Sequence, residues 1–205
     1  MQERINTLRI IFADGLCEFS TLIEQSNKEQ DIFLMMEVKQ EFFYVSHHVK
    51  KIIFLLAAMR HFANTLITKG YRVCYVKHNY PENTQSFTSE IQRAILLYKP
   101  HKIAFITPGE YRVRQDLLTL ISTLGISHQE HDDPKFLVRH AIFRTWAAGK
   151  KNLKMENFYR SVRKKFGILM TDGKPHGGKW NYDAQNRQKA PDNFSPKPRL
   201  TFNID

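Results

Sequence analysis

The stretch KIAFITPGEYRVRQDLLTLISTLGISHQEH (residues 102–131) contains a complete strand–helix–strand pattern, and this pattern decides the fold. Its first six residues form an apolar run typical of a buried strand, which Pro108-Gly109 ends. Apolar residues then recur at steps of three and four, which predicts a helix with one buried face. These residues are Val113, Leu117, Leu120 and Ile121. A further strand is expected near residues 125–131. Because two strands joined through a helix run parallel, the stretch predicts an α/β fold.

The same alternation covers the chain on the N-terminal side of this stretch. Strand-like apolar runs occupy residues 8–13, 32–38 and 71–77. Helical spacing of apolar residues covers 44–69 and 88–98. We expect Ser46 to cap the first of these helices and Gly70 to end it.

These patterns together predict a three-layer, Rossmann-like α/β domain with a central parallel five-stranded sheet. We assign this domain to residues 1–150. Further helices are expected at 134–147 and 152–166. After Gly167 the chain becomes rich in Gly, Pro, Asn and Lys, which predicts an irregular extension. Residues 151–205 are therefore expected to form a basic helix followed by a linker.

Positive charge is concentrated near the C-terminus. The formal net charge is +11; residues 1–149 carry 18 Lys and Arg against 15 Asp and Glu, whereas residues 150–205 carry 13 against 5. Such an excess is found both in solvated tails and in surfaces that bind polyanions such as nucleic acid. The charge alone leaves both interpretations open.

Composition also limits the possible classes of protein. No stretch of about 18 uninterrupted apolar residues occurs, so we expect no membrane association. The first ten residues lack the apolar segment and cleavage site of a secretory signal. Two cysteines, Cys17 and Cys74, cannot build a disulfide framework, and a cytoplasmic location is expected. Neither GxGxxG nor GxxxxGK[ST] is present, which argues against dehydrogenase and ATPase chemistry.

A ligand is expected at the carboxyl ends of the strands, where parallel sheets bind ligands. Carboxylates and phenols follow several predicted strands and suit the hydroxyls and ring N–H groups of a neutral ligand. They are Asp14, Glu41, Tyr44, Glu110 and Tyr111. The alternative is that each acid interacts with a helix N-terminus. No Ser-His-Asp order, nucleophile elbow or paired-carboxylate signature is present, so no catalytic residues are predicted. No metal site is predicted either, because adjacent residues on a helix, such as His47-His48, point about 100° apart.

Five sequence blocks, in order along the chain, resemble the iron–sulfur bacterial cryptochromes and photolyases, also called prokaryotic (6-4) photolyases. The longest are EFFYVSHHVKKIIFLLAAMRHFA (41–63) and RTWAAGKKNLKMENFYRSVRKKFGILM (144–170). The others are NTQSFTSEI (83–91), TPGEYRVR (107–114) and GGKWNYDAQNR (177–187). The likeness extends from residue 8 to about residue 190.

The resemblance implies an N-terminal, photolyase-type antenna domain. In that family this domain holds the chromophore 6,7-dimethyl-8-ribityllumazine. A larger helical domain holds FAD and a four-iron, four-sulfur cluster and repairs (6-4) photoproducts in DNA with light. We expect this catalytic domain to be absent from the chain, since two cysteines cannot bind the cluster. The expected partners are the chain's own FAD domain and UV-damaged DNA in a longer parent, a DNA photolyase (a lyase); the chain alone is not expected to be catalytic.

The same resemblance places the chromophore-binding residues. Glu41 and Tyr44 fall where the family contacts the lumazine, and Leu55 matches an apolar position of that pocket. Ala13-Asp14-Gly15-Leu16 stands where the family has G-D-Q-L, which retains Asp14 as a polar contact. The remaining expected binding residues are Met36, Gly109 and Glu110.

The basic residues of the extension are expected to face DNA or the second domain. Those grouped within two helical turns are Arg160, Arg163, Lys164 and Lys165. Three alternatives stay open: a stand-alone nucleic-acid-binding module, a small-molecule-binding α/β module, and an enzyme acting on a nucleotide-like substrate.

Overall fold

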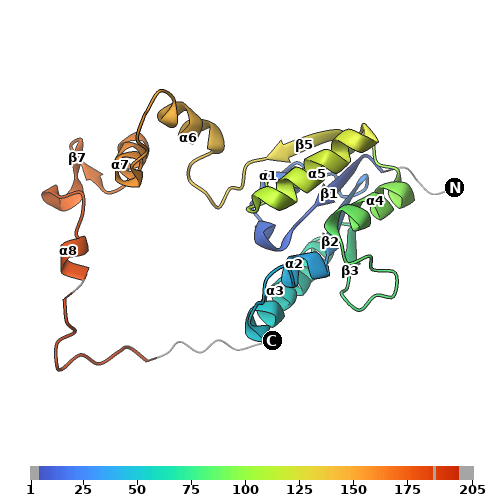
Figure 1. Ribbon diagram of the computed structural model, residues 1–205, viewed down its shortest axis with the longest axis horizontal. Helices are drawn as coiled ribbons and strands as arrows, with labels where there is room; N and C mark the ends of the chain where they lie inside the picture. The colour runs from blue at the N-terminus through green and yellow to red at the C-terminus, as the bar shows by residue number, and fades with distance from the viewer. Residues whose placement is uncertain (1–4, 187, 199–205) are drawn as a thin grey trace. The chain divides into compact units, whose positions relative to one another are not determined.

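A computed structural model describes residues 5–186 and 188–198 of the chain. The chain divides into two compact units, Met1–His140 and Ala141–Asp205. Each unit is described by itself (Figure 1). In the described part of the chain, no helix is both long enough and apolar enough to cross a membrane.

A parallel five-stranded sheet forms the centre of unit 1, as the alternating sequence pattern predicts. Its strands are β1 (Thr7–Ile10), β2 (Asp31–Met36), β3 (Val73–Val76), β4 (Lys102–Ile106) and β5 (Ser127–His131). Their order across the sheet is β3-β2-β1-β4-β5, and every neighbouring pair is parallel. The sheet therefore grows outward in both directions from the central β1.

Helices cover both faces of this sheet and complete three layers. The α-helices of unit 1 are α1 (Thr21–Glu24), α2 (Lys39–Phe42), α3 (Val49–Thr68), α4 (Phe87–Tyr98) and α5 (Tyr111–Leu124). A single turn of 3₁₀ helix, η1 (Ala13–Gly15), follows β1. Buried side chains of α4 and α5 pack on one face, whereas those of α1, α2 and α3 pack on the other.

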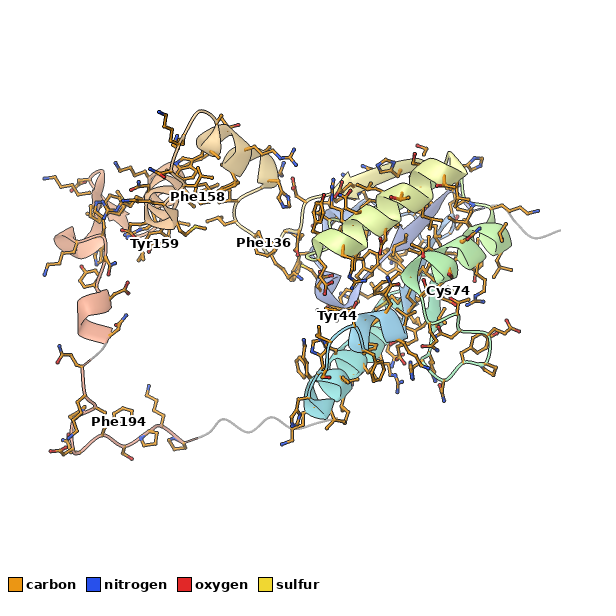
Figure 2. All side chains as sticks on the ribbon, in the orientation of Figure 1. Tyr44, Cys74, Phe136, Phe158, Tyr159 and Phe194 are labelled. Atoms are coloured by element: carbon orange, nitrogen blue, oxygen red, sulfur yellow. The ribbon has the colours of Figure 1, made fainter. Side chains whose placement is uncertain are left out.

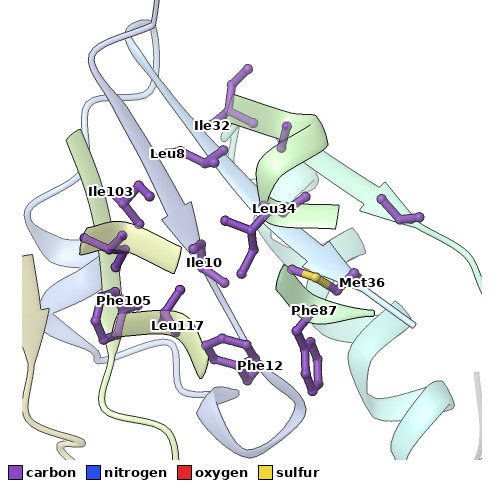
Figure 3. Close-up of a cluster of buried hydrophobic side chains, with 14 of the residues drawn as sticks. Leu8, Ile10, Phe12, Ile32, Leu34, Met36, Phe87, Ile103, Phe105 and Leu117 are labelled. Carbon is purple, nitrogen blue, oxygen red and sulfur yellow. The ribbon is translucent and has the colours of Figure 1, made fainter. Parts of the chain in front are cut away.

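The alternation of side chains along β2 shows how the two cores are separated. Ile32, Leu34 and Met36 join the cluster beneath α4 and α5, part of which is drawn in Figure 3. Phe33 and Met35 join the cluster on the opposite face. All five are at most 4% exposed, because a strand of a parallel sheet is covered on both sides.

Some helical boundaries differ from the sequence prediction. The long helix begins at Val49, and its N-cap is His48, whose Nδ1 accepts a hydrogen bond from the Lys50 backbone at 3.1 Å; the prediction of Ser46 was wrong. The predicted helix 134–147 begins only at His140. Asp133 holds the preceding chain in a turn by accepting a hydrogen bond from the Lys135 backbone. The four-residue helices α1 and α2 were not predicted.

Unit 2 consists of short elements around aromatic contacts. It contains α6 (His140–Ala147, whose first residue belongs to unit 1), α7 (Met155–Phe166), the antiparallel hairpin of β6 (Met170–Thr171) and β7 (Lys174–Pro175), η2 (His176–Gly178) and α8 (Asp183–Asn186). The rings of Phe143, Trp146 and Phe158 lie 4.8–5.9 Å apart between centroids. These rings join α6 to α7.

Candidate functional site

The carboxyl ends of β1 and β4 meet in unit 1. These two strands are neighbours, and the strand order changes direction between them, which is where open α/β sheets bind ligands. Asp14 lies in η1 just after β1, and Gly109 lies just after β4. The Asp14 carboxylate accepts a hydrogen bond from the Gly109 N–H at 2.7 Å. Two residues predicted from different segments are thus in direct contact at the predicted edge of the sheet.

Gly109 permits this close approach because it lacks a side chain. A Cβ at this position would lie 2.8 Å from Oδ2 of Asp14, closer than such atoms pack. Lys135 adds a second tie by donating a hydrogen bond to the backbone carbonyl of Asp14. Asp14 therefore joins the loops after β1 and β4 to the loop after β5.

The carboxyl of Glu41, at the same edge of the sheet, has a raised pKa. Glu41 lies in α2, directly after β2. Burial raises the pKa of its carboxyl to about 7, and the negative charges of Asp14 and Glu110 add to the shift. Arg112 and Lys51 act in the opposite direction. Because the charges of Asp14 and Glu110 act on Glu41, we group these three residues as one acidic cluster.

Tyr44 forms the aromatic side of this cluster. Hydrogen bonding to the Glu110 carboxylate is the main cause that raises the pKa of its phenol. Its ring lies 5.0 Å from the guanidinium of Arg112 and 5.5 Å from the ring of His47. Arg112 in turn pairs with Glu110 at 3.0 Å. Tyr44 is 49% exposed, and Figure 2 labels it.

The two apolar candidates lie on different faces of the sheet. Met36 ends β2, is 2% exposed and belongs to the core beneath α4 and α5. Leu55 of α3 packs against the core on the opposite face. They therefore do not form two facing walls of one pocket. Leu55 lies on the face of the sheet that α2 and α3 cover, whereas Met36 lies on the other face.

A hollow of about 240 Å³ lies beside Gly109, at the ends of β4 and β5. Gly109 and Pro108 line one side, and Asp132, Phe136 and His140 line another. Asp132 and His140 form an ion pair at 3.2 Å when the histidine is protonated. In the part of the chain that the structure describes, no three His, Cys, Asp or Glu side chains are arranged to hold a metal ion.

Sequence reasoning missed a buried ionic network next to the acidic cluster. Glu37 is fully buried, and Arg60 of α3 binds both of its carboxylate oxygens, at 2.6 and 2.9 Å. The phenol of Tyr75 and the backbone N–H of His78 also donate to Glu37. Burial alone would raise the pKa of Glu37, but these hydrogen bonds outweigh it and lower the pKa. The sequence feature that could have indicated this network is Glu37 itself, an acid at the end of an otherwise apolar strand.

In unit 2, the four predicted basic residues are placed differently from one another. Arg163 is 5% exposed and donates to the backbone carbonyls of Ile168 and Leu169. Its guanidinium thus supports the loop after α7. Arg160 pairs with Glu156 at 2.8 Å. The ammonium groups of Lys164 and Lys165 lie over aromatic rings, those of Trp180 and Phe166 respectively.

Comparison of the sequence with known proteins identifies relatives of this chain. The chain is 44% identical over 194 residues to a (6-4) photolyase of Agrobacterium fabrum, which covers 94% of this chain and 38% of that protein. It is 26% identical over 196 residues to an uncharacterized protein of Acanthamoeba polyphaga mimivirus, covering 91% of this chain and 96% of the viral protein. The chain thus spans well under half of the first relative and nearly all of the second.

A sequence model of one family matches the chain over residues 9–205. That match includes the acidic cluster, the basic unit and the sheet from Arg9 of β1 onward. The chain belongs to the deoxyribodipyrimidine photo-lyase-related protein family.

Proposed function

We propose that unit 1 binds a light-harvesting pigment, 6,7-dimethyl-8-ribityllumazine, for a light-driven DNA repair protein of the photolyase type. The observation that carries this proposal is the meeting of Asp14 and Gly109 at the ends of β1 and β4, with Glu41, Tyr44 and Glu110 gathered around them. The (6-4) photolyase relative supports the photolyase-type reaction.

The donors and acceptors of this cluster fit a neutral ligand that carries many hydroxyls. The carboxyl oxygens of Asp14 and Glu110 can accept hydrogen bonds from ribityl hydroxyls. Because the pKa of Glu41 is about 7, its carboxyl is partly protonated near neutral pH and can also donate to a ring carbonyl or nitrogen. Tyr44 supplies an exposed aromatic ring, and Leu55 supplies apolar surface on the face of α2 and α3. The negative charge of the cluster disfavours phosphate-bearing ligands.

A bound lumazine would supply absorption of blue light and transfer of that energy to a flavin. The residues of this chain need only hold the ring, fix its orientation and keep water away. Such a role needs no nucleophile and no general base. We assign FAD, the iron–sulfur cluster and the repair step to the part of a longer parent protein that corresponds to the remainder of the Agrobacterium relative.

Titration of the purified 205-residue chain with the lumazine tests this proposal, with calorimetry and the absorption band of the pigment as readouts. We expect retention of the pigment and a shifted band. Glu41→Ala should weaken binding by about 1–3 kcal/mol through loss of a hydrogen bond to a partly charged group. Glu24→Ala, an exposed acid on α1, is the matched control and should bind normally. Absence of binding by the unaltered chain would contradict the proposal.

A second function is favoured by the charge of unit 2. Residues 141–205 carry 14 Lys and Arg against 5 Asp and Glu, and we propose that they contribute a DNA-binding surface. Affinity of the chain for duplex DNA should then fall steeply between about 50 and 200 mM salt, because each phosphate contact releases counterions. Binding that does not depend on salt would argue against this surface.

A further inference from the structure

Unit 2 encloses a hollow of about 450 Å³ that the pigment proposal does not use. It lies between α7, the loop after α7, η2 and the start of α8. Its volume is within the range of sites that hold small molecules or single nucleotides. Tyr159 of α7, labelled in Figure 2, lines it. Trp180 and Tyr182 line it as well.

Four of the nine residues that line this hollow carry an aromatic ring. Tyr159, Trp180, Tyr182 and the imidazole of His176 all contribute surface to it. Tyr159 and Tyr182 are each 44% exposed, so part of each ring is accessible to a ligand. Proteins that bind unpaired nucleotides use such rings to stack the bases.

The hollow also offers polar groups suited to the edge of a base. Glu156, Asn181 and Asp183 line it beside the rings. Glu156 also pairs with Arg160, and Asn181 Oδ1 also accepts a hydrogen bond from the Asp183 backbone, so a base would share these acceptors. A carboxylate accepts hydrogen bonds from the exocyclic amine of cytosine, and an amide both donates and accepts. Stacking surface and edge-recognising groups therefore occur in one place.

Arg163 holds this arrangement in place before any ligand binds. Its guanidinium lies 5.4 Å from the ring of Tyr159 and 5.2 Å from that of Trp180, and it donates to two backbone carbonyls of the following loop. Tyr182 donates to the carbonyls of His176 and Gly177. A site whose rings are fixed in advance loses less entropy on binding.

Positive charge next to the hollow indicates that the base would come from a nucleic-acid strand. The cationic groups of Arg160 and Lys164 lie 5.4 and 5.6 Å from the Trp180 ring, and Lys165 and Lys179 are exposed close by in the sequence. We propose that this hollow takes a single unstacked base of a DNA strand, while the surrounding cations contact the flanking phosphates. This inference rests on the proposed DNA-binding surface of unit 2.

Fluorescence of Trp180 tests the proposal directly. The chain has two tryptophans, so Trp146→Phe leaves Trp180 as the single reporter. The titrants are a duplex with one extrahelical cytosine, the same duplex with an extrahelical abasic residue, and the fully paired duplex. We expect the extrahelical cytosine to quench Trp180 and to bind about tenfold more tightly than the abasic duplex, which has the same phosphates. Anisotropy of labelled duplexes with the unaltered chain gives the same comparison without the substitution.

Matched variants separate stacking from charge. Tyr159→Leu should remove the preference for the cytosine duplex over the abasic duplex. Phe194→Leu, an exposed aromatic residue of unit 2 that does not line this hollow, should keep the preference. Lys164→Gln should weaken binding of all three duplexes by a similar factor.

The outcomes also distinguish this proposal from the one on which it rests. Salt-dependent binding with equal affinity for the cytosine and abasic duplexes would overturn the base site and leave the DNA-binding surface standing. No binding of any duplex at low salt would overturn both. Quenching by free cytidine monophosphate, without a preference among the duplexes, would show that the hollow takes a free nucleotide and would refute a strand as the source.

Discussion

Glu41 is the residue whose charge state is most strongly altered by the fold near the proposed pigment site. Its pKa is about 7 in the folded chain and about 4.5 for an ordinary glutamate. Between these values the unfolded chain has released the proton while the folded chain still holds it. The stability that the raised pKa of Glu41 contributes is therefore fully present below pH 4.5. It is lost as the pH rises through about 7.

Glu41→Gln should remove this loss. We expect the variant and the unaltered chain to have equal unfolding free energies below pH 4.5, with the variant more stable by about 1–3 kcal/mol above pH 7. Urea denaturation at several pH values measures the difference, and Glu24→Gln serves as the exposed control. A constant difference at every pH would show that the carboxyl is not held in its neutral form.

Asp14 and Gly109 show why sequence could place part of the site but not its contacts. Both follow predicted strands, so the pattern predicted that they lie at one edge of the sheet. Their direct hydrogen bond depends on which strands are neighbours, and the pattern left the order of the strands open. The strand order β3-β2-β1-β4-β5 puts the loops after β1 and β4 side by side.

At the scale of elements, the Glu37–Arg60 pair joins β2 to α3. Glu37 is fully buried, and the Arg60 side chain is 49% exposed, so loss of the arginine would leave a buried carboxylate without its main partner. We expect Arg60→Met to lower the free energy of unfolding by about 3 kcal/mol. Lys69→Met, which removes an exposed pair with Glu18 just after the same helix, should cost less than about 1 kcal/mol.

Chemical denaturation of the two variants makes this comparison. If the buried carboxylate is the cause, a second substitution, Glu37→Gln, should cost less in the Arg60→Met background than in the unaltered chain. Equal effects of Arg60→Met and Lys69→Met would mean that Glu37 finds water or another donor when Arg60 is removed.

Elements were predictable where hydrophobic periodicity was strong. The five strands have apolar runs of several residues, and apolar residues recur over several turns in the helices α3, α4, α5 and α7. The structure contains each of these elements. Four-residue helices such as α1 and α2 are too short to show a period. The late start of α6 and the cap at His48 depend on single hydrogen bonds, which periodicity does not register. The Glu37–Arg60 pair was missed for the same reason.

At the scale of the molecule, the two units divide charge unequally. Residues 1–140 carry 17 Lys and Arg against 15 Asp and Glu, whereas residues 141–205 carry 14 against 5. The acidic cluster lies in unit 1, and the cations around Trp180 lie in unit 2. This division suits a chain in which one unit holds a neutral pigment and the other contacts a polyanion. The mimiviral relative, matched over 96% of its length, is a protein of similar extent.

If unit 2 provides the DNA contacts, the salt dependence of binding should respond to its cations alone. We expect Lys164→Gln to reduce the slope of log affinity against log salt by about 1, the value for one lost phosphate contact. Lys77→Gln, an exposed lysine of unit 1, should leave the slope unchanged. Duplex titrations at several salt concentrations measure both slopes. A specific surface releases fewer counterions only when one of its own phosphate contacts is removed. Equal reductions of the slope by the two variants would therefore mean that DNA binding depends on the overall net charge of the chain.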